Sequence, residues 1–135
     1  MIVTMEWLGR YLAIKEEIEV IETRLDAIDG LKSLRLSDNP SHTSNNEGID
    51  SLLIRRGDLY RKYLEKLAEA REVVYEIVVF LEGVKDPTTR NIIRLKYIDG
   101  LTWREVGNCL GLDHSACYRR VEEVLSGSPH NNREM

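Results

Sequence analysis

The sequence predicts an all-α protein, in which an N-terminal antiparallel hairpin of long, coiled-coil-like helices precedes a C-terminal three-helix domain with a helix-turn-helix. Two observations predict this fold. Apolar residues recur at alternating spacings of four and three through the first part of the chain, which is the pattern of paired helices. The stretch from Asp86 to Leu125 then carries the start and stop signals of short helices.

The first helix is predicted from Thr4 to about Asp29. Its apolar series alternates spacings of four and three and consists of Trp7, Tyr11, Ile14, Ile18, Ile21, Leu25 and Ile28. After it, residues 30–48 are mostly polar, with too little apolar surface to order themselves. We therefore expect a flexible loop over 30–48.

A long second helix is predicted from about Ile49 to Val84. Its series keeps the same rhythm and consists of Ile49, Leu53, Arg56, Tyr60, Tyr63, Leu67, Ala70, Val74, Ile77, Leu81 and Val84. A first helix that ends at Asp29 would leave part of this seam uncovered. The apolar segment from Val73 to Leu81 is interpreted as a subunit interface or as the platform on which the C-terminal helices pack. The simpler alternative is that it packs only on its own domain's helices.

The junction between the two parts is short. Gly83 is suited to end a helix, Asp86 to cap the next one and Pro87 to occupy its first turn. The next helix is predicted from Thr88 to Ile98, with Ile92, Ile93, Leu95 and either Tyr97 or Ile98 inside. The expected division is a hairpin and oligomerisation region at 1–84, the helix-turn-helix domain at 85–126 and a disordered tail at 127–135.

A capping box predicts where the helix-turn-helix begins. In Thr102-Trp103-Arg104-Glu105 the hydroxyl caps a backbone amide three residues on, and the carboxylate reaches back. Val106 and Leu110 supply the buried stripe of this helix, and Gly111 supplies the left-handed residue that ends it.

Asp113 then caps the second helix of the motif. Its buried positions, at spacings of four and three, are Cys117, Val121 and Val124. This spacing leaves His114, Ser115, Tyr118, Arg119 and Glu122 on the exposed face. Two short helices with a polar second helix are what the major groove of DNA accepts.

These residues resemble a known family. The run LTWREVG from Leu101 to Gly107, followed by Leu110, Gly111 and Leu112, resembles region 4, the promoter-reading C-terminal domain of bacterial sigma-70-type factors. The wider arrangement resembles small sigma-region-4-like proteins of Gram-positive phages and integrative elements, including late-gene activators. The resemblance implies a transcriptional regulator that binds specific double-stranded DNA, and it leaves contact with RNA polymerase open.

The resemblance also implies which residues contact DNA. The matching positions that face DNA in the sigma family are His114, Ser115, Tyr118 and Arg119. Thr102 and Arg104, at the start of the preceding helix, complete the candidate set. The chain departs from the family pattern at Ala116, where a basic residue is common, and at Asp113, which adds negative charge at the helix tip.

The charge distribution separates the two parts. The net charge is −4, whereas a strong DNA-binding domain is usually basic. Residues 1–84 hold 11 Lys/Arg and 16 Asp/Glu, and residues 85–135 hold 8 and 7, so the acidic excess lies away from the proposed DNA surface. A nearly neutral C-terminal part predicts few phosphate contacts and weak, salt-sensitive binding.

Other classes of function find little support. The sequence shows no Gly-rich phosphate loop, nucleophile elbow or HExxH motif, so we expect neither an enzyme nor a cofactor. His42, His114 and His130 are widely separated, and Cys109 and Cys117 lack paired spacing, so we expect no metal and interpret both cysteines as reduced core residues. Without an 18-residue apolar run or a secretion signal, the expected location is the cytoplasm of a bacterial host.

Two rival functions remain at this stage. A phage small terminase subunit also joins a helix-turn-helix to an oligomerising hairpin, and a ring of many subunits would favour it. A sigma-like protein-interaction module would instead grip polymerase or a host factor, and the acidic balance favours it. A monomer or dimer would favour transcription, and for the protein itself we expect a homodimer or higher homo-oligomer through the N-terminal helices.

Several candidate residues also have purely structural interpretations. Tyr118 could lie on the surface without a ligand, and Arg119 and Arg120 could pair with Glu122 or Glu123. Trp103 could close over the small core. The basic residues of the preceding helix, Arg90, Arg94 and Lys96, could face phosphate or form solvated salt bridges.

Overall fold

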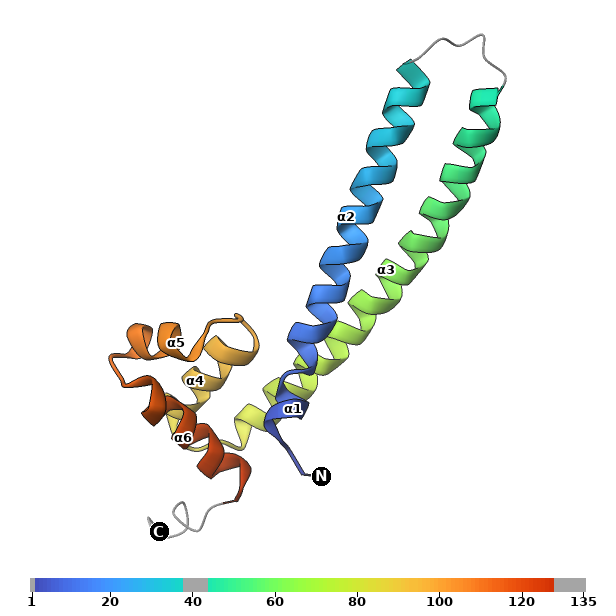
Figure 1. Cartoon of the computed structure of the whole chain (residues 1–135). Helices are drawn as coiled ribbons and strands as arrows, with labels where there is room; N and C mark the ends of the chain where they lie inside the picture. Colours follow the sequence, from blue (N-terminus) through green and yellow to red (C-terminus); the bar gives the residue numbers. More distant parts are fainter. Residues whose placement is uncertain (1, 38–43, 128–135) are drawn as a thin grey trace. The chain divides into compact units, whose positions relative to one another are not determined.

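The computed structural model describes residues 2–37 and 44–127 and confirms the all-α fold. A short α1 (Met5–Leu8) precedes the long pair α2 (Arg10–Ser37) and α3 (Ser44–Glu82). The three C-terminal helices are α4 (Pro87–Tyr97), α5 (Trp103–Leu110) and α6 (His114–Leu125). Figure 1 shows α2 and α3 as an antiparallel hairpin and α4, α5 and α6 grouped together. No helix in the described ranges is long and apolar enough to span a membrane.

By their internal contacts, the residues form two compact units. One unit comprises residues 14–71, which form most of the hairpin. The other comprises residues 1–13 and 72–135, so the first turns of the chain and the last turns of α3 belong with α4, α5 and α6. This grouping cuts through α2 and α3, whereas the functional division expected from the sequence falls after Val84.

The bounds of the hairpin helices differ from those expected. The first helix is interrupted at Gly9, where α1 ends, and α2 then continues through Gly30 to Ser37. A flexible loop over the whole of 30–48 is therefore wrong, because residues 30–37 and 44–48 are helical; residues 38–43 lie outside the described residues. Gly30 has no left-handed backbone, so it weakens the helix by about 1 kcal/mol without ending it.

The seam of α2 is as expected, but that of α3 is shifted by one residue in places. Along α2 the buried side chains of the hairpin unit are Ile14, Ile18, Ile21, Leu25 and Ile28. On α3, Leu52 is buried instead of Leu53, and Tyr60 is 44% exposed. The inward positions also include Arg56 and Tyr63, which bind carboxylates of α2: Arg56 Nε lies 2.8 Å from Asp29 Oδ1, and Tyr63 donates to Glu22 over 3.1 Å.

The end of α3 packs within the other unit. Ile77 is fully buried in the single chain, so the seam that we expected to stay open is closed at this residue. The N-terminal turns contact this region: the rings of Trp7 and Phe80 meet edge to face at 6.1 Å, and Arg10 forms a 2.7 Å ion pair with Glu76. These contacts are with the N-terminal turns of the chain, so at these residues they favour the simpler alternative, packing on the protein's own N-terminal helices, over the subunit interface.

Helix α4 begins and packs as the sequence predicts. Asp86 caps it and Pro87 occupies its first position. Ile92, Ile93 and Tyr97 are buried, while Leu95 and Ile98 are half-buried. The predicted alternative between Tyr97 and Ile98 is therefore resolved in favour of Tyr97.

Candidate nucleic-acid interface

The capping box at the start of α5 forms in full. The Thr102 hydroxyl accepts from the amide of Glu105 over 3.1 Å, and the Thr102 amide donates to Glu105 Oε1 over 2.8 Å. The predicted helix start at Thr102 is confirmed. Because the hydroxyl acts as an acceptor in this box, its hydrogen can still be donated to a phosphate oxygen.

Two glycines fix the turn between α5 and α6. Gly111 ends α5 with φ 68°, the left-handed conformation that the sequence predicted. Gly107 has a role that sequence reasoning did not assign: a Cβ there would lie 2.5 Å from the carbonyl oxygen of Leu112. The Leu112 amide also donates to the Gly107 carbonyl over 2.9 Å. Only glycine allows the chain leaving the turn to pass this close to α5, and a glycine inside a short helix was the available signal.

Helix α6 is oriented by its cap and its buried stripe. Asp113 Oδ2 accepts from the Ser115 amide over 3.0 Å. The hydrogen bonding of Ser115 to this carboxylate lowers the pKa of Asp113, which keeps it charged at neutral pH. Cys117 and Val121 have no exposed area, and Val124 is half-buried.

The opposite side of α6 carries the candidate DNA contacts. His114, Ser115, Tyr118 and Arg119 are all exposed, and they occupy the first two turns of the helix. The exposed residues of the next turn are the acidic Glu122 and Glu123. The N-terminal half of α6 therefore carries no carboxylate after the Asp113 cap, whereas the C-terminal half carries two. Recognition helices place their N-terminal half against base edges.

An aromatic cluster holds Tyr118. Trp103 of α5 meets Tyr118 edge to face at 5.3 Å and Tyr97 of α4 at 6.2 Å, and Lys96 Nζ lies 5.0 Å from the centre of the Trp103 ring. Trp103 therefore closes over the small core, the structural alternative left open above. Tyr118 stays 40% exposed although its ring is positioned, so the hydroxyl end can reach a ligand at little cost in side-chain entropy.

Arginines that looked alike in the sequence differ in the structure. Arg120 forms a 2.9 Å ion pair with Asp86 rather than with Glu122 or Glu123. Arg90 donates to the carbonyl oxygens of Val84 and Lys85, so it helps to close the junction before α4. Arg104 and Arg119 are exposed, and within the described ranges neither forms an ion pair. These two are the arginines of the candidate set that are available to DNA.

The two cysteines occupy different environments. Cys117 is fully buried, and burial raises the pKa of its thiol. Cys109 is exposed, so its interpretation as a core residue is wrong. The inward side of the short helix α5 is formed by Val106 and Gly107, and Cys109 lies outside that stripe.

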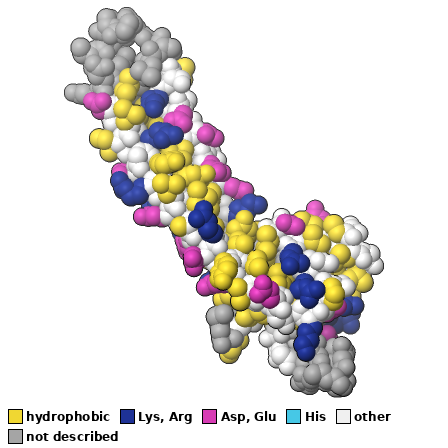
Figure 2. Space-filling view, turned by 180° about the vertical axis from the view of Figure 1, so that it is seen from behind, with side chains coloured by type: hydrophobic (Ala, Val, Ile, Leu, Met, Phe, Trp, Pro, Cys, Tyr) yellow, Lys and Arg dark blue, Asp and Glu magenta, His cyan; other side chains and the backbone are white. Residues whose placement is uncertain are grey.

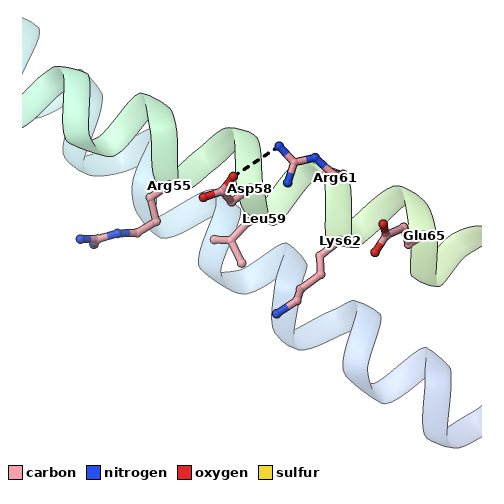
Figure 3. Close-up of a pocket in the computed structure, with 6 residues that line it drawn as sticks. All are labelled: Arg55, Asp58, Leu59, Arg61, Lys62 and Glu65. Atoms are coloured by element: carbon pink, nitrogen blue, oxygen red, sulfur yellow. Dashed lines mark ion pairs between the residues drawn. The ribbon is translucent and has the colours of Figure 1, made fainter.

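A surface hollow of about 320 Å³ lies on the hairpin, in the other unit from the candidate residues. All of its lining side chains come from α3: Arg55, Asp58, Leu59, Arg61, Lys62 and Glu65. Figure 3 shows them spread along the helix, with an ion pair between Asp58 and Arg61 and with Leu59 pointing toward α2. Side chains of both charges that do not converge on one point are a poor basis for a substrate site.

Comparisons with known proteins found no match to this chain among protein-family models, curated proteins or solved structures. The resemblance to sigma region 4 therefore depends on the residues of α5 and α6 themselves.

Proposed function

We propose that this protein is a sequence-specific DNA-binding regulator of transcription, with α6 as its recognition helix. The observation that carries the proposal is the exposed set of His114, Ser115, Tyr118 and Arg119 on the first two turns of α6. The capping box and the Gly107–Leu112 contact fix this helix against α5, so its exposed side chains are presented from a defined backbone. The resemblance to sigma region 4 adds phage or mobile-element genes as the expected targets and RNA polymerase as a second expected partner.

Each candidate residue has a chemical role in this proposal. Arg119 can donate two parallel hydrogen bonds to the O6 and N7 of a guanine, the commonest specific contact in the major groove. Tyr118, held by Trp103, can reach a phosphate or a thymine methyl group. Ser115 and Thr102 can donate to phosphate or base acceptors, while Arg104 supplies charge near the backbone.

The electrostatics predict modest affinity. Because Arg90 and Arg120 are engaged within the protein, few cations are left for phosphates. The affinity of a protein that makes about three phosphate contacts should fall with a log–log salt slope of only about −3. Sequence preference, rather than total affinity, is thus the property to measure.

The test selects bound sequences from a random duplex pool with the full chain and then titrates the enriched duplex by fluorescence anisotropy. Arg119→Ala should weaken binding by about 1 to 3 kcal/mol and relax the preference at one base pair. Arg55→Ala is the matched control, because it removes the same charge from the exposed surface of the hairpin. It should leave the base preference unchanged.

Two outcomes would contradict the proposal. One is an Arg119→Ala protein with normal helix content and unchanged affinity and preference for the enriched duplex. The other is the failure of any sequence to be enriched, and retained binding to RNA polymerase in that case would favour the protein-interaction module.

A further inference from the structure

A series of three aromatic rings connects the core of the C-terminal helices to the exposed side of α6. Tyr97 of α4 is buried, with 6% of its area exposed. Trp103 of α5 meets Tyr97 edge to face at 6.2 Å and meets Tyr118 of α6 in the same way at 5.3 Å. Each ring belongs to a different helix, so the position of the Tyr118 ring depends on side chains outside its own helix.

Trp103 is the central member of this series. It is the first residue of α5 and directly follows the Thr102 cap, so the capping box fixes its backbone. Its side chain is half-buried. Besides the two tyrosine rings it is contacted by Lys96 of α4, whose Nζ lies 5.0 Å from the centre of the indole ring. Because edge-to-face ring pairs are favourable beyond the area that they bury, the indole is a defined support for the Tyr118 ring.

The exposed part of Tyr118 lies among the candidate DNA contacts. The side chain is 40% exposed, and Ser115 precedes it by three residues on the same side of α6. Long side chains in helices lean toward the N-terminus of their helix. We therefore expect the ring to lean toward the half of α6 that recognition helices place against base edges.

A phosphate is a poor partner for this ring. Figure 2 shows Lys and Arg side chains beside hydrophobic ones on the face of the C-terminal helices that it presents. The exposed cations Arg104 and Arg119 are the better phosphate ligands, because charge-assisted hydrogen bonds are about twice as strong as those of a neutral hydroxyl. The face of an aromatic ring is its negative side, and an apolar surface does not replace the hydration that a phosphate loses on contact. Glu122, one turn after Tyr118 on the same side of α6, adds a carboxylate that also disfavours an anion.

An apolar group on a base is the better partner. Of the four bases, thymine is the one that presents such a group in the major groove, its C5 methyl. Removing one methyl group from water against the ring should raise the affinity about fourfold. This gain is largest when the ring is already in place, because a freely rotating side chain would lose its freedom on contact.

We propose that Trp103 is a positioning residue that holds Tyr118 as the reader of a thymine methyl group in the major groove. This role rests on the proposed function and deepens it, because it names one base that the surface of α6 reads. It also gives Trp103 a second role besides closing over the small core, since Trp103 acts on DNA through Tyr118.

The first test uses the full chain and the duplex enriched from the random pool. Each thymine in turn is replaced by uracil, which removes only the methyl group, and the affinity is measured by fluorescence anisotropy. At one position or more, the wild type should bind the uracil duplex about fourfold more weakly. Tyr118→Ala should lose this penalty at one such position, which we call the Tyr118 site. Tyr118→Phe keeps the ring without the hydroxyl and should retain the penalty there.

The second test changes the support instead of the reader. Trp103→Leu should reduce the uracil penalty at the Tyr118 site to less than about twofold, because leucine fills part of the space without giving Tyr118 a ring to pack on. Trp103→Phe restores a ring and should recover most of the penalty. Circular dichroism checks the helix content of both variants, and Trp103→Met takes the place of the leucine variant if that one does not fold.

Trp7→Leu is the matched control. Trp7 meets Phe80 edge to face at 6.1 Å and has Arg10 over its ring at 4.6 Å. It thus has the same kinds of contact as Trp103 in the same unit, but with α3 and α2 instead of α6. Trp7→Leu should lower the thermal stability and leave the uracil penalty unchanged, which separates positioning from a general loss of stability.

Three outcomes would overturn this role of Trp103 while leaving the proposed function in place. One is an enriched duplex at which Tyr118→Ala removes no uracil penalty; equal weakening of all duplexes by Tyr118→Phe would then assign the hydroxyl to a phosphate. Another is a folded Trp103→Leu protein that keeps the full penalty at the Tyr118 site. The third is a Trp7→Leu protein that loses the penalty as Trp103→Leu does. The failure of any sequence to be enriched would instead contradict the proposed function, and the role of Trp103 with it.

Discussion

Asp86 joins the start of α4 to α6, and its replacement should destabilise the unit that holds the candidate DNA contacts. Its carboxylate accepts from the Thr88 and Thr89 amides at 3.4 and 3.3 Å. It also accepts from the Thr89 hydroxyl at 2.7 Å and from Arg120 Nη1 at 2.9 Å. One side chain thus caps a helix and anchors another that is 34 residues away in sequence.

The expected magnitude follows from these bonds. Loss of an Asp cap costs about 0.5 to 2 kcal/mol. The ion pair with Arg120 contributes at most about 1 kcal/mol, because both side chains are nearly half exposed. Asp86→Ala should therefore lower the free energy of unfolding by about 0.5 to 3 kcal/mol. Asp86→Asn keeps a capping oxygen and should lose less than about 1 kcal/mol.

The assay is urea unfolding followed by circular dichroism, with a double-mutant cycle between Asp86→Ala and Arg120→Ala. Because the ion pair is lost in both single variants, their combined effect should be smaller than the sum of the two. Equal losses in Asp86→Ala and Asp86→Asn would refute the capping role. Strictly additive losses in the cycle would refute the ion pair.

The pKa of Asp86 gives the same prediction a pH dependence. Burial alone would raise this pKa, but the hydrogen bonds from Thr89 and Thr88 and the charge of Arg120 outweigh it and leave the pKa below 3.8. A carboxyl group with a lowered pKa in the folded state contributes stability above its unfolded pKa, and this contribution is lost as the pH falls through the folded pKa. The difference in stability between wild type and Asp86→Asn should therefore be largest at neutral pH and vanish in strong acid.

Three further substitutions test the packing of the same unit. Thr102→Ala should lower the stability measured in thermal melts by about 1 kcal/mol. The Thr102→Ala/Glu105→Ala double variant should lose less than the sum of the two single variants, because both residues act through one capping box. Gly107→Ala should lower the free energy of unfolding by about 1 to 3 kcal/mol, because the new methyl group would meet the Leu112 carbonyl. Gly30→Ala should raise it by about 0.4 to 1 kcal/mol, because the space around this helical position is open. Equal changes in the two variants would refute the close approach at the turn. Ile77→Asp should unfold this unit in circular dichroism, because the position is fully buried in the single chain; a folded variant that only dissociates would instead place Ile77 in a subunit interface.

The C-terminal helices were predictable because their ends are decided locally. The capping box at Thr102, the left-handed Gly111 and the Asp113 cap each involve residues within a few positions of one another. Their bonds form in the way that general rules of capping require. The exposed face of α6 then follows from the positions of Cys117 and Val121.

The hairpin was predictable in kind but not in register. Two series on α3 satisfy the heptad rule, and they share Arg56, Tyr63 and Ala70. The sequence of α3 alone therefore does not decide between Leu52 and Leu53 as the inward residue. The choice depends on which side chains can bind α2, and here Lys66, in place of Leu67, lies 3.2 Å from Glu17 of that helix. Gly30 shows the other limit: a glycine ends a helix only when its backbone becomes left-handed, and that is a property of the fold.

Contacts between distant residues were the hardest to foresee at the candidate site. The sequence offered Glu122 and Glu123 as near partners for Arg120, but the arginine binds Asp86 of another helix. The approach of Leu112 to Gly107 depends likewise on the angle between two helices. The spacing of residues along one helix predicts which side chains share a face. It does not predict which groups of another helix contact that face.

These pairings bear on how strongly the protein would bind DNA under the proposed function. Each arginine that holds the fold, such as Arg90 or Arg120, is one cation fewer for the proposed DNA surface, in a C-terminal part whose charge is already near neutral. A single chain is therefore poorly equipped to hold DNA by charge alone. Association of two chains would place two copies of α6 in one particle without adding any cation to either chain. The second contact would then form at the high effective concentration that tethering gives. Within the proposed function, association of two chains is thus a physically sufficient answer to the weak charge of the C-terminal part.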